Sequence, residues 1–198
     1  MKAGRPVLGK GPVPCEFMVV GSQPGYEEDR TGVVFSGKTG QELDRFLDGD
    51  RLPSRDQVYL TNIYSVYKGK DYVYTAEDLD AERLRLEREI ESVSPSLIIT
   101  LGREATRYFL GDVDMEDVHS IPWQWPDDPA VTVFSLYHIA AGLRNPESAA
   151  LVTYGFEQLA AFLRGDLAER KLYDDPYPNP VYKLVRGGEV CSVLQHSY

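Results

Sequence analysis

The side chains best suited to chemistry follow short apolar runs at separate places in the chain. The first run ends in Gly-Ser-Gln-Pro-Gly, and two acids, Glu28 and Asp29, and an isolated Phe35 come soon after it. Asn62 follows a second apolar run, and His138 ends another. An aromatic face, an amide, an imidazole and a turn with many backbone amides are the groups that bind a flat polar heterocycle. An amide both donates and accepts hydrogen bonds, and an aromatic ring stacks on a planar base.

Each of these residues also has a purely structural interpretation when it is taken alone. The turn is typical of a strand-to-helix connection, and paired acids such as Glu28 and Asp29 are common on surfaces and in the first turn of a helix. An isolated aromatic such as Phe35 is more often part of a core, and Asn62 is a common turn former. His138, like the other two histidines, fits a structural role as well as a catalytic one.

The elements that would position these side chains alternate along the sequence. Short segments rich in β-branched and apolar residues predict strands over 17–21, 58–64, 96–102 and 130–138. Helical spacing of apolar residues predicts helices over 39–49, 75–93, 103–111 and 146–165. This alternation predicts an α/β fold, a three-layer α/β/α sandwich around a central, mainly parallel four-stranded sheet. Ligands of such sheets bind where the strands end, which is where the candidate residues lie.

Local signals mark the ends of the predicted helices and of the domain. Thr75 and Asp78 form a capping-box pair, Pro146 lies in the first turn of the last helix, and Gly165 lies at its end. The run Arg83–Glu89 alternates charges and is typical of a solvated helix face. After Gly165 the composition changes, so we expect a domain over 1–165 and a C-terminal extension over 166–198 that packs on or beside it.

The composition restricts the class of protein. At 198 residues, 42% of them hydrophobic, the chain suits one globular domain. Cys15 and Cys191 form no disulfide or metal pattern, which favours a reducing cytoplasm. The N-terminus has no signal-peptide pattern, and no apolar run is long enough to cross a membrane. A net charge of −10 opposes binding of nucleic acid by bulk attraction, but leaves room for a small basic face.

Five motifs in a fixed order give the chain a resemblance to a known family. Between about Val19 and Gly165 they are G-x-x-P-G-x-x-E-D, G-x-x-F-x-G-x-x-G, T-N, P-x-x-I-x-x-L-G-x-x-A and H-x-x-x-x-L-R-N-P. This succession resembles the uracil-DNA glycosylase superfamily, most closely the bacterial and archaeal branch called family 4. The resemblance implies the fold of that superfamily and a hydrolase that removes a base after flipping it out of DNA.

The resemblance also implies roles for the base-binding residues. Phe35 corresponds to the aromatic that stacks on the flipped base, and Asn62 to the asparagine that binds the edge of the pyrimidine. We expect Ser22 and the amide of Gly25 to line the same site. His138 corresponds to the histidine that stabilises negative charge on the base oxygen while the bond breaks.

The remaining matches concern the sugar, the water and the DNA. Glu28 corresponds to an acid near the C5 side of the base, and we assign Gln23 with Glu28 or Asp29 to the attacking water and the cationic sugar. The loop from Ile139 to Arg144 corresponds to one that presses into the minor groove, with Leu143 as a wedge. The basic residues on or just after the strand-end loops, which we expect to contact DNA, are Arg30, Lys38, Lys68, Lys70, Arg103, Arg107 and Arg144.

The chain departs from the family pattern near the catalytic loop and at the cofactor. Ser22 replaces a glutamate, and Gln23 stands where the best-studied branch has an aspartate. Family-4 enzymes carry four cysteines for an iron–sulfur cluster, and Glu82 and Val66 fall roughly where two of those ligands would stand. We therefore expect no cluster, no other cofactor and no metal.

The substrate and the reaction outcome are left partly open by the sequence. Uracil is the first expectation, while the short side chains of Ser22, Ala141 and Gly142 favour a bulkier 5-substituted pyrimidine, such as a hydroxymethylated or glucosylated base, in a defence rather than a repair role. No lysine matches a catalytic position, so we expect hydrolysis without strand cleavage. Alternatives are a low-turnover binder of modified or single-stranded DNA and an N-glycosidase of free nucleotides. The oligomeric state, with a monomer as the default, and the role of the extension stay open.

Overall fold

The computed structural model describes residues 4–48, 51–67 and 75–169. Four residues singled out from the sequence, together with most of the C-terminal extension, lie outside these ranges: Lys68, Lys70, Cys191 and His196. Within the extension, residues 166–169 are described, and the Thr132 hydroxyl donates a hydrogen bond to Glu169. The chain therefore returns from the last helix to the central sheet.

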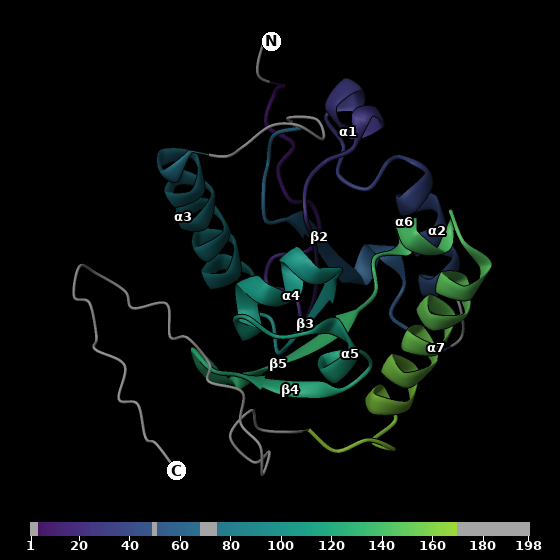
Figure 1. Ribbon diagram of the computed structural model, residues 1–198. Coiled ribbons are helices and arrows are strands. Elements are labelled where there is room, and N and C mark those ends of the chain that lie inside the picture. The colour runs from purple at the N-terminus through teal and green to yellow at the C-terminus, as the bar shows by residue number, and fades with distance from the viewer. Residues whose placement is uncertain (1–3, 49–50, 68–74, 170–198) are drawn as a thin grey trace, which may run out of the picture.

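The centre of the protein is a five-stranded sheet with the order β2-β1-β3-β5-β4 (Figure 1). Its strands are β1 (Phe17–Gly21), β2 (Val58–Asn62), β3 (Leu97–Leu101), β4 (Pro122–Trp125) and β5 (Asp128–Leu136). The four predicted strands are present and mutually parallel, whereas β4 is the outermost strand and pairs antiparallel with β5. The prediction of four strands is therefore corrected to five. β4 is only four residues long and begins with a proline, which argues against a strand in the sequence.

Helices cover both faces of the sheet (Figure 1). They are α1 (Tyr26–Thr31), α2 (Lys38–Leu47), α3 (Ala76–Val93), α4 (Arg103–Leu110), α5 (Met115–Val118), α6 (Ile139–Gly142) and α7 (Pro146–Leu163). The four longer helices match the predicted ones to within two residues at each end. The three short ones, of four to six residues, are too short to show a helical repeat in the sequence. None of the described helices is long and apolar enough to cross a bilayer.

Alternate residues of the parallel strands enter two separate cores. Val19 and Ile99 face the core formed with α2 and α7, while Val20 and Ile98 face the core formed with α3 and α4. A strand that is covered on both faces is mostly apolar, which explains the apolar runs, and the buried hydroxyls of Thr100 and Ser135 are hydrogen-bonded to each other. The predicted three-layer α/β/α sandwich is confirmed.

The predicted helix ends are present as well. The Asp78 amide donates to the Thr75 hydroxyl and the Thr75 amide to the Asp78 carboxylate, each at 3.1 Å, at the start of α3. Pro146 is the first residue of α7. Gly165 follows the end of that helix with φ +82°, a conformation in which glycine is favoured.

The start of α2 lies unusually close to the loop before it. A methyl group on Gly40 would overlap the carbonyl of Phe35 and come within 2.9 Å of the Phe35 Cα. Because this neighbour is backbone, it cannot rotate out of the way. The loop that carries Phe35 therefore requires glycine at position 40.

We expect Gly40→Ala to destabilise the protein, although alanine is the better helix former by about 1 kcal/mol. Overpacking of this kind typically costs 1–3 kcal/mol, and we expect a net loss of about 2 kcal/mol in urea denaturation. Lys38→Ala, at an exposed position in the same helix, is the matched control and should change stability by less than about 0.5 kcal/mol. A Gly40→Ala protein as stable as the wild type would contradict the close approach.

Candidate active site

The carboxyl ends of the four parallel strands lie along one edge of the sheet. Gly21 at the end of β1 pairs with Asn62 at the end of β2, and Leu101 pairs with Leu136 at the ends of β3 and β5. β1 and β3 are neighbours in the same register. The residues that follow these strands, including His138, therefore lie at the same edge as Asn62.

Phe35 and Asn62 meet over the backbone of Gly21. A methyl group at Gly21 would overlap the Asn62 side-chain oxygen and would lie 2.9 Å from Cζ of Phe35. Both side chains are nearly buried, with 6% and 5% of their surfaces exposed. An aromatic ring and a side-chain amide from distant parts of the sequence thus converge at one point on the strand-end edge.

The Phe35 backbone adopts a left-handed conformation, with φ +50°. For a residue other than glycine this costs about 1–2 kcal/mol. One nitrogen of Arg55 donates to the carbonyls of Val34 and Phe35, each at 3.1 Å, and the guanidinium also pairs with Asp44 on α2. These contacts stabilise the strained loop and fix the orientation of the ring.

Glu28 is a buried carboxylate that ties two loops together. One oxygen accepts a hydrogen bond from the amide of Gly25 at 3.0 Å, and the other from the amide of Gly37 at 2.8 Å. Gly25 precedes α1 and Gly37 precedes α2. Glu28 therefore holds the start of both helices beside the strand-end edge, and each of its oxygens is already engaged.

The other predicted residues of this loop, which are Asp29, Ser22 and Gln23, have different surroundings. A methyl group at Gly4 would overlap the Asp29 carboxylate, so this side chain packs against the N-terminal segment. The Ser22 hydroxyl donates a hydrogen bond to Glu104 on α4. Gln23 is partly buried on the same loop. The loop backbone continues the sheet, because the amide of Tyr64 donates to the carbonyl of Ser22 at 2.9 Å.

His138 lies over Gly102, whose φ of +91° favours glycine; a methyl group there would come within 3.0 Å of the histidine Cβ. His138 caps α6, because its Nδ1 accepts the Ala140 amide at 3.1 Å. A neutral ring with Nδ1 as the acceptor carries its proton on Nε2. His138 can therefore donate one hydrogen bond from Nε2 to a ligand.

Burial lowers the pKa of His138 below the ordinary 6.5, and the positive charge of Arg144 lowers it further, whereas Glu104 opposes the shift. The ring is therefore neutral at pH 7. A neutral imidazole donates to a developing anion without first having to gain a proton.

The loop between α6 and α7 presents the predicted DNA-contacting side chains. Leu143 is 50% exposed, and Arg144 is exposed beside it. Arg103 is also exposed, at the first position of α4. Two other predicted DNA contacts are partly neutralised, since Arg30 pairs with Glu27 and Arg107 with Asp112.

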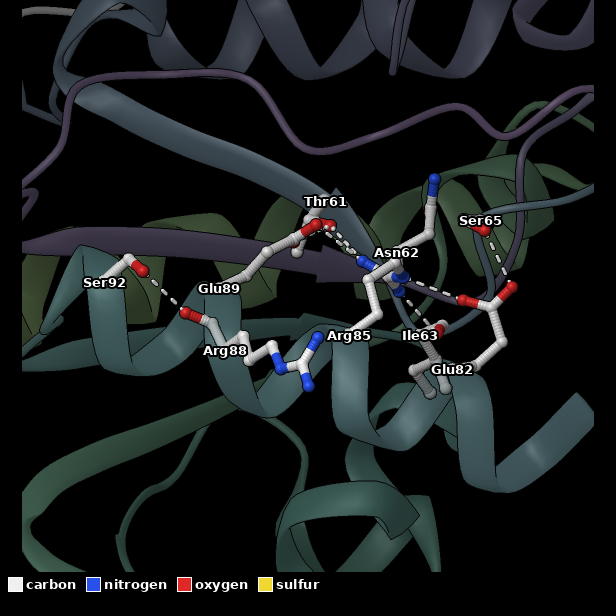
Figure 2. A network of polar contacts seen from close by, with 9 residues as sticks. All are labelled: Thr61, Asn62, Ile63, Ser65, Glu82, Arg85, Arg88, Glu89 and Ser92. Atoms are coloured by element: carbon white, nitrogen blue, oxygen red, sulfur yellow. Dashed lines mark hydrogen bonds and ion pairs between the residues drawn. The ribbon is translucent and has the colours of Figure 1, made fainter.

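Arg85 on α3 forms a hydrogen-bond network with the end of β2 (Figure 2). Its Nε donates to Glu82 at 2.7 Å, and Nη1 donates to Glu89 at 2.7 Å and to the Thr61 hydroxyl at 3.5 Å. Nη2 donates to the carbonyls of Asn62 and Ile63 at 2.6 and 2.7 Å. All five N–H groups of the guanidinium are used, so α3 holds the backbone that carries Asn62.

The interpretation of Arg83–Glu89 as a solvated face is wrong for its inward half. The Arg85 side chain is only 17% exposed, and Glu82 and Glu89 beside it are nearly buried. Glu82, which stands roughly where a family-4 cluster ligand would stand, pairs with Arg85 and accepts from the Ser65 hydroxyl at 2.7 Å. The charge spacing was visible in the sequence, but the burial of one side of the helix was not.

Glu104 is a second residue that the sequence did not single out. It follows β3 in the motif Leu-Gly-Arg-Glu-Ala, beside Arg103, which is the residue of this motif predicted to contact DNA. Its contact with Ser22 crosses between the loops after β1 and β3. A contact between segments so far apart in the sequence has no local sequence pattern that would predict it. In the described ranges, no group of three or more His, Cys, Asp or Glu side chains is arranged to hold a metal ion.

Comparison with known proteins gives one consistent result. Residues 8–164 match the sequence model of the uracil DNA glycosylase superfamily. Curated relatives include a type-4 uracil-DNA glycosylase from Sulfurisphaera tokodaii, 30% identical over 77% of this chain and 72% of the relative. Proteins of the same name from Saccharolobus solfataricus (31% identical, covering 77% and 74%) and Thermotoga maritima (28% identical, covering 80% and 83%) also match.

We expect Arg85→Gln to destabilise the protein by about 3 kcal/mol in urea denaturation, because it leaves two nearly buried carboxylates without their cation. Arg85→Lys keeps the charge but cannot reach both carbonyls and both acids, so its stability should lie between that of the wild type and that of Arg85→Gln. Arg83→Gln, an exposed arginine of the same helix with its own acidic partners, is the matched control and should cost less than about 1 kcal/mol. Equal losses for the two glutamine variants would contradict the bracing role of Arg85.

We expect NMR titration of His138 to give a pKa below 6.5 in the folded protein. The folded state then binds fewer protons than the unfolded state, so the contribution of His138 to stability is lost as the pH falls from about 6.5 toward the folded-state pKa. Arg144→Ala removes a nearby positive charge and should raise the pKa of His138. Arg164→Ala, at the far end of α7, should leave it unchanged. A folded-state pKa of 6.5 or more would contradict this environment.

Proposed function

Because this chain belongs to the uracil-DNA glycosylase superfamily, a group of DNA N-glycosylases, we propose that it removes uracil from DNA by hydrolysis and leaves an abasic site. The observation that carries the proposal is the meeting of Phe35 and Asn62 over Gly21. His138 follows the end of β5, which β3 separates from β1, at the same edge. Stacking, edge recognition and an anion-stabilising donor are thus available together.

Base recognition follows from the properties of these groups. Flipping a base out of the stack costs a few kcal/mol, which stacking on Phe35 offsets by about 1–3 kcal/mol. The Asn62 amide donates to a carbonyl of the pyrimidine and accepts from its ring N–H. Cytosine presents the opposite donor and acceptor pattern at that edge, so this arrangement favours uracil.

Bond cleavage follows from the position of the neutral histidine. When the C1′–N1 bond breaks, the electron pair moves onto the base, and Nε2–H of His138 stabilises the resulting oxyanion. Removing one such donor typically lowers kcat 100- to 1,000-fold. Water then attacks the oxocarbenium sugar. No covalent bond between protein and sugar is required.

DNA binding is assigned to the loop between α6 and α7 and to Arg103. Leu143, half exposed on that loop, is placed to fill the gap left by the flipped nucleotide. Arg103 and Arg144 supply positive charge on an otherwise acidic chain. Since the contacts are few, we expect affinity to be modest and to fall steeply with salt.

A 5-substituted pyrimidine is the second substrate candidate. The short side chains of Ser22, Ala141 and Gly142 support it, because they leave more room beside a base than long ones would. The candidates are hydroxymethylated and glucosylated bases, and the enzyme would then serve defence against modified viral DNA. A low-turnover binder on this fold is the alternative outside catalysis.

We expect the wild-type protein to release free uracil from DNA, and His138→Ala to lower the single-turnover rate 100- to 1,000-fold while DNA affinity stays within about twofold. The measurement is mass spectrometry of bases released from a panel of oligonucleotides with uracil, 5-hydroxymethyl and glucosylated pyrimidines, single- and double-stranded. The panel also identifies the substrate. No released base from any of them, with DNA binding retained, would favour the binder.

We also expect no strand cleavage beyond the abasic site. Borohydride trapping detects the Schiff base that a lyase forms between an amine and the sugar. Its absence during uracil release is the expected result, and a trapped protein–DNA adduct would contradict a purely hydrolytic reaction.

A further inference from the structure

We propose that Glu104, oriented by Ser22, is the carboxylate that accepts the proton of the attacking water. This inference deepens the proposed function and rests on it. Glu104 is the second residue of α4, directly after the end of β3. Ser22 is the first residue after β1, the neighbouring strand. The Ser22–Glu104 hydrogen bond therefore lies across the strand-end edge that carries the base-binding residues.

The start of α4 lies beside His138, and the charge of Glu104 acts on residues of the same edge. Gly102, two residues before Glu104, packs directly against the ring of His138. Burial is the main cause of the lowered pKa of His138 and of the raised pKa of Tyr64, and the negative charge of Glu104 opposes the first shift and adds to the second. Glu104 thus contacts the loop after β1 through Ser22 and belongs to the segment that packs against His138, after β5.

The two acids expected from the sequence for this task have other surroundings. Both oxygens of Glu28 accept backbone amides, and Oδ1 of Asp29 is buried against Gly4, without a hydrogen-bond partner among the described residues. Gln23 is able to hold a water but cannot take a proton from it. A carboxylate that reaches the same loop from α4 supplies the missing proton acceptor.

The environment of Glu104 suits a proton acceptor. The residue is exposed, so it exchanges protons with solvent after each turnover. The Ser22 hydroxyl donates to one carboxylate oxygen, Oε2, which orients the group and leaves Oε1 for a water. A negative charge here also stabilises the positive charge that develops on the sugar.

The reaction balances with these groups alone. The C1′–N1 bond breaks, and its electron pair leaves with the base, whose oxyanion is bound by His138. The water oxygen forms a bond to C1′, and one of its protons passes to Oε1 of Glu104. Glu104 then loses that proton to solvent, and the base anion gains one, which yields the free base and an abasic sugar with a hydroxyl at C1′.

The first test is Glu104→Gln, which keeps the shape of the side chain but cannot accept a proton. We expect kcat for uracil release to fall 100- to 10,000-fold, while the Kd for DNA and the unfolding midpoint stay unchanged. Glu91→Gln, an exposed glutamate on α3 away from the strand-end edge, is the matched control and should retain wild-type activity. Ser22→Ala keeps the carboxylate but loses its orientation, so we expect about a tenfold loss in kcat.

The second test moves the carboxylate to the other partner. In the double variant Ser22→Glu/Glu104→Ser, the acid reaches the same position from the loop after β1, and we expect at least tenfold more activity than in Glu104→Gln. Ser22→Asn/Glu104→Gln, which can keep a hydrogen bond between the two loops but has no carboxylate, should not recover activity, and this separates proton acceptance from a purely structural role. Glu104→Gln activity within threefold of an active wild type would overturn the inference and leave the proposed function intact. If the wild-type protein released no base from any oligonucleotide of the panel, the proposed function itself would be overturned.

Discussion

The absence of a side chain at Gly21 is the constraint on which the site depends. Phe35 comes from the loop after α1 and Asn62 from the end of β2, and both occupy the space where a Cβ of residue 21 would lie. Any side chain at this position would separate the two groups, because the strands on either side fix the backbone. The backbone of the sheet, more than that of the loops, therefore determines that the Phe35 ring and the Asn62 amide meet.

Buried and partly buried charged groups hold the segments around this point in place. Glu28 links the starts of α1 and α2, Arg55 stabilises the strained Phe35, and Arg85 fixes the backbone of Asn62. Burying charge is costly unless every donor and acceptor is satisfied, and apolar residues would stabilise the fold equally well. Charged groups reach backbone carbonyls and amides with defined geometry, which apolar contacts do not. These interactions fix the geometry of the binding groups at some cost in the free energy of unfolding.

The sequence predicted the layers of this fold well and the partners of its polar groups poorly. Apolar runs and helical repeats are local signals, so the four parallel strands and the four long helices were found, whereas β4 and the shortest helices were too short to show a repeat. The edge location of Asn62 and His138 followed from the strand ends. Glu28 and Asp29 are adjacent and chemically alike, yet one is buried between two amides and the other packs against Gly4. Only the path of distant segments decides between such outcomes, and the same is true of Arg85 and Glu104.

The charges around His138 suit the role of neutral donor that is proposed for it. Burial and Arg144 both favour the neutral ring, and Glu104 favours the protonated one. Because the two nearby charges oppose each other, burial decides, and the ring is neutral, with Nε2–H left as its donor. A neutral donor that stabilises the departing base does not have to transfer its own proton. In the proposed reaction the attacking water must lose a proton, for which a carboxylate is the suitable group, and the base anion gains a proton afterwards. Under the proposal, the base side and the water side of the reaction are assigned to different residues on neighbouring strand ends.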